Sequence, residues 1–282
     1  MLFDVSLTPP QIEFVVKPGV TLTQAYSVTN NGSDTLYLIP SVNPWQPLSD
    51  DGSVSYDNIS MPLGIEFSLA NAETKINQTF SLAPKTSKQL VLKIKTTSDF
   101  QPQDVYATFF ISQDASTSIN SSSTSTQATA RLGSHILLTV NDTADPQSTP
   151  NLQNLLIIPR FKDIFFTPIT IQGNVTNDSE FFFKTFGHLT LSKNDLLLKD
   201  FELVPLNVLS HHNRQIQCSE SCTFSPPFWP GAYTATLSLD ASASGKSVST
   251  TFFIFPFSVF IPLMLIFAFV FISRYLRRTT TN

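Results

Sequence analysis

The sequence predicts an all-β protein, with two tandem β-sandwich domains followed by one C-terminal transmembrane helix. Three observations support this fold class. Short runs of alternating apolar and polar residues recur along the chain, separated by Gly, Pro, Asn and Asp, as in antiparallel sheets. No amphipathic helical stretch of useful length occurs before the C-terminal apolar run. That run, residues 252–273, contains no charged residue and is long enough to span a bilayer as a helix.

The first domain is expected at residues 1–143, where the alternation is clearest. In QLVLKIK, the apolar residues Leu90, Leu92 and Ile94 share one face while lysines occupy the other, as a half-buried strand requires. Further strands of this domain are expected at residues 104–112, 135–140, 12–16, 22–29, 36–39 and 65–69.

Two polar segments interrupt the strand pattern. Residues 114–130 are rich in Ser and Thr and predict a long flexible loop between two strands. This loop is either a displayed contact loop or an insertion tolerated at a loop tip. Residues 144–153, rich in Pro, Asp, Ser and Thr, are interpreted as the linker between the domains.

The second domain is expected at residues 154–254 and resembles the first. A strand ending in Val-Thr-Asn precedes a polar turn at residues 27–34 and again at 174–180. Tyr106 and Tyr233 each open a late strand, as in the tyrosine corner of immunoglobulin-like sandwiches. Both domains are therefore predicted to be immunoglobulin-like. Strands are expected at residues 155–158, 169–175, 188–191, 201–205, 232–239 and 248–253.

The C-terminal helix is expected at residues 255–275, with a cytoplasmic basic tail at 276–282. Arg274, Arg277 and Arg278 follow the apolar run, and the positive-inside rule places them on the cytoplasmic side. The predicted location is therefore the cell membrane, in a single pass with both domains extracellular. The chain starts MLFDVSLTPPQ, without the pattern of a signal peptide. Either a leader is missing, which we favour, or the protein is tail-anchored and faces the cytosol.

The charges exclude one class of partner. Before residue 252 the formal net charge is −7, since all 21 acidic residues but only 14 of the 17 basic residues precede it. No block of Lys and Arg occurs there, so nucleic-acid binding is not expected.

The cysteines Cys218 and Cys222 are the only two in the chain. Outside the cell, two cysteines at this spacing are expected to form a small loop-closing disulfide. A zinc site with His211 and His212 and a pair of free thiols are the alternatives. Adjacent histidines suit a single metal ion poorly, and no metal or cofactor is predicted.

Two tryptophans flanked by prolines are candidate binding aromatics. Trp45 and Trp229 either form a binding face or plug the end of a sandwich core, and the second interpretation is favoured. The tripeptide GKS at residues 245–247 lacks the earlier glycine of a phosphate loop. No nucleophile elbow or HExxH motif occurs, so the protein is not predicted to be an enzyme.

Three segments resemble bacterial cell-surface proteins of the WxL-interacting family. They are LTPPQIEFVVKPGVTLTQAYSVTNNGSDTLYL, FSLAPKTSKQLVLKIK and RLGSHILLTV. The resemblance implies two immunoglobulin-like domains, related to pilus-chaperone-like sandwiches, with one transmembrane helix and a short basic tail. It also implies that the first domain is associated with peptidoglycan and the second with a partner protein.

The function predicted from these features is non-catalytic binding or scaffolding at the cell surface. The expected partners are the lipid bilayer, and either peptidoglycan or another protein of the envelope. The alternative is a structural spacer or secretion-associated envelope component without a ligand of its own. The sequence identifies neither the ligand nor the oligomeric state.

Overall fold

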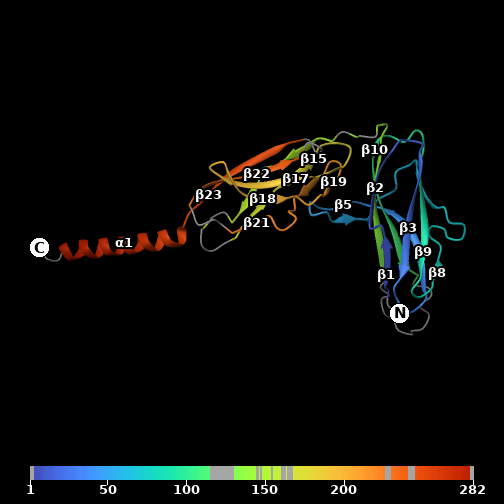
Figure 1. The fold of residues 1–282 in the computed structure, drawn as a ribbon, viewed down its shortest axis with the longest axis horizontal. Helices are drawn as coiled ribbons and strands as arrows, with labels where there is room; N and C mark the ends of the chain where they lie inside the picture. The colour runs from blue at the N-terminus through green and yellow to red at the C-terminus, as the bar shows by residue number, and fades with distance from the viewer. Residues whose placement is uncertain are drawn as a thin grey trace. The chain divides into compact units, whose positions relative to one another are not determined.

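The computed structural model describes residues 3–279, except 115–129, 144–145, 147, 154, 160–162, 164–167, 226–229 and 241–244, and without the side chains of 275–279. The described residues form strands and one C-terminal helix (Figure 1), which confirms the predicted fold class. The chain divides into two compact units. Unit 1 contains Met1–Gln147 and Glu180–Phe182; unit 2 contains Ser148–Ser179 and Phe183–Asn282.

Unit 1 is a sandwich of two sheets. The four-stranded sheet has the order β1 (Val5–Thr8), β3 (Thr21–Asn30), β9 (Ser87–Thr96) and β7 (Ile65–Leu69). The five-stranded sheet has the order β2 (Gln11–Val16), β11 (Arg131–Val140), β10 (Gln103–Gln113), β4 (Leu36–Pro44) and β8 (Phe80–Leu82). A short hairpin of β5 (Gln46–Pro47) and β6 (Val54–Ser55) follows β4.

The chain of unit 1 changes sheets near its start. β1 pairs antiparallel with β3 in one sheet, and β2 pairs parallel with β11 in the other. Pro9 and Pro10 lie between the two strands, where proline can replace a ladder residue without the loss of a hydrogen bond. The resulting strand orders match the two-sheet arrangement of immunoglobulin-like sandwiches.

The core of unit 1 lies between the two sheets. Alternate residues of each strand point inward, so Leu90, Leu92 and Ile94 of β9 meet Ala107 and Phe109 of β10 in one buried cluster. At the centre, the ring of Tyr26 lies 4.8 Å from the ring of Phe109.

Unit 2 has a core of its own. Its four-stranded sheet has the order β18 (Leu196–Glu202), β17 (Gly187–Lys193), β22 (Gly231–Leu239) and β23 (Ser247–Ile254). One three-stranded sheet has the order β13 (Leu156–Ile158), β14 (Ile169–Gln172) and β21 (Thr223–Phe224). A second has the order β12 (Pro150–Leu152), β15 (Asn174–Asn177) and β20 (Asn213–Gln215). β16 (Phe183–Lys184) pairs with β19 (Asn207–Val208). Their apolar faces form one buried cluster that includes Leu189, Tyr233 and Leu237.

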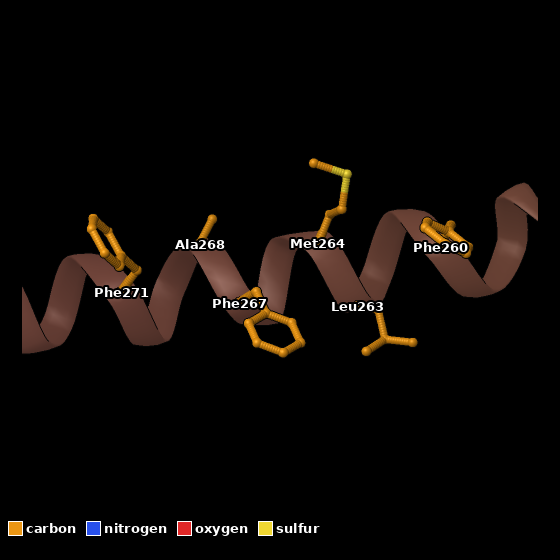
Figure 2. A pocket seen from close by; sticks show the side chains of 6 residues that line it. All are labelled: Phe260, Leu263, Met264, Phe267, Ala268 and Phe271. Atoms are coloured by element: carbon orange, nitrogen blue, oxygen red, sulfur yellow. The ribbon is translucent and has the colours of Figure 1, made fainter.

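The helix α1 (Phe257–Thr279) follows β23 closely in the chain. Its segment Phe257–Arg274 has a mean hydropathy of 2.2, and the helix is long and apolar enough to cross a membrane. Figure 2 shows apolar side chains such as Phe260, Met264 and Phe267 projecting from it, and all three are exposed. Helical structure continues into residues expected to be tail, because arginine is a good helix former.

A carboxylate of unit 2 contacts the start of α1. The backbone N–H of Ser258 donates to Oδ2 of Asp163 at 2.6 Å, and the Ser258 hydroxyl donates to Oδ1 at 3.0 Å. A carboxylate in this position satisfies an otherwise unpaired N–H and interacts favourably with the helix dipole.

Candidate interaction site on the first sandwich

The outer face of the five-stranded sheet of unit 1 carries a second layer of packed side chains, some of them buried. On β10, Ala107 and Phe109 point into the core, so Tyr106, Thr108 and Phe110 point outward. The outward face of a sandwich is usually exposed to solvent, but Thr108 and Phe110 are buried. The outer cluster comprises Trp45, Tyr56, Tyr106, Thr108, Phe110, Arg131 and His135.

Trp45 lies in this outer cluster. Its backbone N–H donates to the Tyr106 carbonyl at 3.2 Å, and its indole Nε1–H donates to the Ala107 carbonyl at 2.8 Å. The indole stacks on Tyr106 at a centroid distance of 5.0 Å and meets the edge of His135 at 5.3 Å. Trp45 is only 6% exposed and lies outside the core between the sheets. It therefore fixes the outer layer, and the second candidate aromatic, Trp229, lies outside the described residues.

A chain of polar groups connects the cluster across the strands. The hydroxyls of Tyr56 and Thr108 are 3.0 Å apart, and the Thr108 hydroxyl is 3.0 Å from Nδ1 of His135. Burial lowers the pKa of His135, which favours the neutral imidazole. Tyr56 directly follows β6, so its contact with Thr108 holds the β5–β6 hairpin against the five-stranded sheet.

A carboxyl group lies beside the cluster. Burial raises the pKa of Asp104, although hydrogen bonds from Thr139 at 2.6 Å and from Tyr106 at 2.7 Å oppose the rise. The bond from the Tyr106 hydroxyl restrains the ring on which Trp45 stacks.

The end of β11 is held by aromatic contacts. The guanidinium of Arg131 lies 4.5 Å from the ring centroid of Phe110 and 5.4 Å from that of Tyr56. Gly133 leaves the space that the Phe110 ring uses. A Cβ at Gly133 would lie 2.6 Å from Cγ2 of Thr108 and 2.8 Å from Cε1 of Phe110.

The same end of β11 presents an open strand edge. β2 covers β11 from His135 onward, and within the described ranges no strand pairs with residues 131–134 on that side. The N–H of His135 donates to the Pro10 carbonyl, so it points to the β2 side. Backbone groups alternate along a strand, and the N–H and C=O groups of Arg131 and Gly133 therefore point to this open side.

The remaining predicted site residues lie elsewhere. Cys218 and Cys222 are joined by a disulfide in unit 2, next to a bridge between Leu203 and Cys218. Nδ1 of His212 contacts the Ser210 carbonyl at 2.6 Å. Among the residues that the structure describes, no group of three His, Cys, Asp or Glu is placed to hold a metal ion.

Two predicted features fall partly beyond the described residues. Arg274 is exposed near the end of α1, while the side chains of Arg277 and Arg278 are not described. Most of the predicted Ser/Thr loop, residues 115–129, is likewise outside the described residues.

The fold defines a tandem immunoglobulin-like β-sandwich protein with a C-terminal apolar helix. In the part of the chain that the structure describes, no strand pairs with one side of β11 at residues 131–134. No protein-family model matches the sequence, and no curated protein matches it. The resemblance to the WxL-interacting family therefore finds no support in these comparisons.

Several solved structures are similar to the chain, all at low identity. The class 5 fimbriae chaperone CfaA is 10% identical with a TM-score of 0.43, over 90% of this chain and 100% of that chain. The E. coli chaperone DraB is 15% identical with a TM-score of 0.38, over 88% and 98%. A chain of the Salmonella enterica SafA pilin complex with the SafB chaperone is 12% identical with a TM-score of 0.38, over 90% and 97%.

Proposed function

We propose that the protein is a membrane-anchored, non-catalytic binding or scaffolding protein of the cell envelope. Its first sandwich pairs with an extended segment of a partner protein along the open end of β11. The backbone groups of Arg131 and Gly133 point away from β10, and no described strand pairs with them; this is the observation that carries the proposal. An unpaired strand edge is a template for another chain, and addition of a strand is a common mode of peptide recognition.

The outer cluster prepares this edge for binding. The Arg131 guanidinium covers the rings of Phe110 and Tyr56, and the ring of Phe110 lies close over Gly133. A backbone held in the bound conformation loses less entropy when a partner pairs with it. The exposed Arg131 side chain also offers a positive charge to an acidic or carbonyl-rich segment.

The helix α1 supplies the anchor in this proposal. Its apolar segment spans the bilayer, and the arginines at its end remain on the cytoplasmic side, with both sandwiches outside the cell. Protease added to intact cells would then digest the sandwiches and leave a tag at the C-terminus protected. Digestion of the C-terminal tag alone would show the opposite orientation, with the sandwiches inside the cell.

Two substitutions at one position test the binding edge. Arg131→Ala removes the guanidinium but keeps the backbone N–H, whereas Arg131→Pro also removes the N–H and blocks strand pairing. The full-length protein in detergent is used to capture proteins from solubilised envelope, and separately to bind purified cell wall. We expect Arg131→Pro to lose a captured protein that Arg131→Ala retains.

Other outcomes would contradict this proposal. Equal capture by both variants would exclude pairing along β11. Binding to purified cell wall alone, unchanged in both variants, would identify peptidoglycan as the partner instead. Absence of any captured component would favour a structural spacer without a ligand.

A further inference from the structure

We propose that the tip of the β17–β18 hairpin inserts into the interfacial region of the bilayer and gives unit 2 a second membrane contact. The leucine tip comprises Leu196, Leu197 and Leu198. This inference rests on α1 spanning the membrane, as proposed above.

The register of the four-stranded sheet places the tip. Lys193 of β17 pairs with Leu196 of β18, and the turn between the two strands closes the hairpin. One residue earlier, Ser192 pairs with Thr234 of β22, which pairs with Thr251 of β23. The tip therefore lies at the end of the sheet where β23 finishes and the chain enters α1.

The separation between the tip and the chain's entry into α1 is short. β18 is three strands from β23, which corresponds to about 14 Å across the sheet at the usual strand spacing. β23 ends at Ile254 and α1 begins at Phe257. A bilayer crossed by α1 consequently begins close to the level of the leucine tip.

The leucine tip is apolar and uncovered. The exposed fractions are 67% for Leu196, 57% for Leu197 and 38% for Leu198. Consecutive residues of a strand point to opposite faces, so three leucines in a row make both faces of this edge apolar. Such a patch on an edge strand is unfavourable in water and marks a contact surface.

Aromatic side chains surround the start of α1 at the same end of unit 2. Phe253 is 58% exposed, and the ring of Phe255 lies 6.4 Å from Phe253, 5.1 Å from Phe257 and 4.9 Å from Phe260. The hairpin is restrained near its tip, because Nζ of Lys193 donates to the Pro230 carbonyl at 3.1 Å and lies 5.1 Å from the Tyr233 ring. Two apolar patches thus lie at the same end of the four-stranded sheet, one on each edge strand, as contact with a single bilayer surface requires.

The charges near the tip favour an apolar contact over an electrostatic one. Lys193 and Lys199 are balanced by Asp195 and Asp200. A cavity of about 500 Å³ opens beside Leu198, lined also by Leu191, Lys199, Thr223, Phe224 and Ser225. Leu191, Leu198 and Phe224 give it an apolar lining that suits an acyl chain, while Lys199, Thr223 and Ser225 give it polar groups that suit a phospholipid headgroup. We therefore expect contact with neutral phospholipid, independent of anionic lipid.

Photo-crosslinking tests this contact in the full-length protein. The protein is reconstituted in phosphatidylcholine nanodiscs that contain a phospholipid with a diazirine on its acyl chain, and crosslinked residues are mapped by mass spectrometry. We expect crosslinks in α1 and at the leucine tip. Residues 246–248, at the opposite end of β23, should carry none. Leu197→Asp should lose the crosslinks at the tip and keep those in α1.

The outcomes separate this inference from the anchoring proposal. Crosslinks in α1 without any at the leucine tip would overturn the inference and leave the anchor intact. An unlabelled α1 would overturn both. Tip crosslinks that persist in Leu197→Asp, or that appear only with anionic lipid, would also contradict an apolar insertion.

Discussion

Gly133 shows how a single residue shapes the outer face of the first sandwich. Its missing side chain allows the Thr108 methyl and the Phe110 ring to close over β11. A Cβ at Gly133 would clash with these two side chains, whereas the backbone conformation of Gly133 would accept a side chain. Neighbouring side chains on a sheet face interact directly, so a small residue on one strand accommodates large ones on the next.

We expect Gly133→Ala to destabilise unit 1 by about 1–3 kcal/mol, as is typical of overpacking. Unfolding by urea, followed by Trp45 fluorescence in a Trp229→Phe background, measures this change. The matched control introduces Gly133→Ala into a Thr108→Ser variant, which keeps the hydroxyl but lacks the methyl at 2.6 Å. The cost should be smaller in that background. An equal cost in both backgrounds would contradict the packing explanation.

We expect His135 to make the stability of unit 1 depend on pH. Burial lowers its pKa in the folded state below the ordinary value of 6.5, and the unfolded chain therefore binds a proton first as the pH falls. Stability should be complete above pH 6.5, decline as the pH falls through that value, and level off below the folded-state pKa.

The His135→Gln variant isolates this contribution. Glutamine retains a hydrogen-bonding group near Thr108 but does not titrate. Urea unfolding at a series of pH values should show a smaller loss of stability between pH 7 and pH 5 in the variant than in the parent protein. Identical pH profiles for the two proteins would exclude His135 as the source.

At the scale of elements, the turn closed by Cys218 and Cys222 joins two short pairings of unit 2. Cys218 forms a bridge with Leu203, and β21 begins at Thr223, directly after Cys222. The first pairing is a single bridge, and the second joins two residues of β21 to β14. A covalent link of this kind acts chiefly by restricting the unfolded chain.

We expect both cysteines to resist alkylation until a reductant is added, with the change read from the mass of the intact protein. For so short a loop, replacement of both cysteines by serine should reduce the stability of unit 2 by about 2 kcal/mol. Alkylation of both thiols without a reductant would show that no disulfide forms in the native protein.

The elements also show where sequence patterns succeed and where they do not. β9, β10 and β11 carry apolar residues at alternate positions and were predicted, although β11 was expected only over residues 135–140. The pairs β5–β6 and β16–β19 are two residues long and leave no periodic signal. β12 forms at Pro150–Leu152, within the segment interpreted as a linker, because β15 offers a pairing edge there.

At the scale of the whole molecule, two sandwiches with separate cores precede a helix that is apolar enough to span a bilayer. This organisation suits a protein that presents binding surfaces from a membrane. The domain bounds 1–143 and 154–254 remain predictions, while the structure itself groups the chain into two units. The open end of β11 and the leucine tip are the two surfaces that the proposals assign to a protein partner and to lipid.

The sequence by itself determined the fold class, because alternation with period two and an uncharged apolar run are local properties of the chain. Only the tertiary structure decided that Trp45 packs on the outside of a sheet. It also decided that β2 stops short of Arg131 and that the leucine tip lies level with the entry into α1. Each of these facts depends on how strands distant in sequence pair and pack on one another. The pattern of one strand says which face is buried, but it does not say which strand lies beside it or where that partner ends.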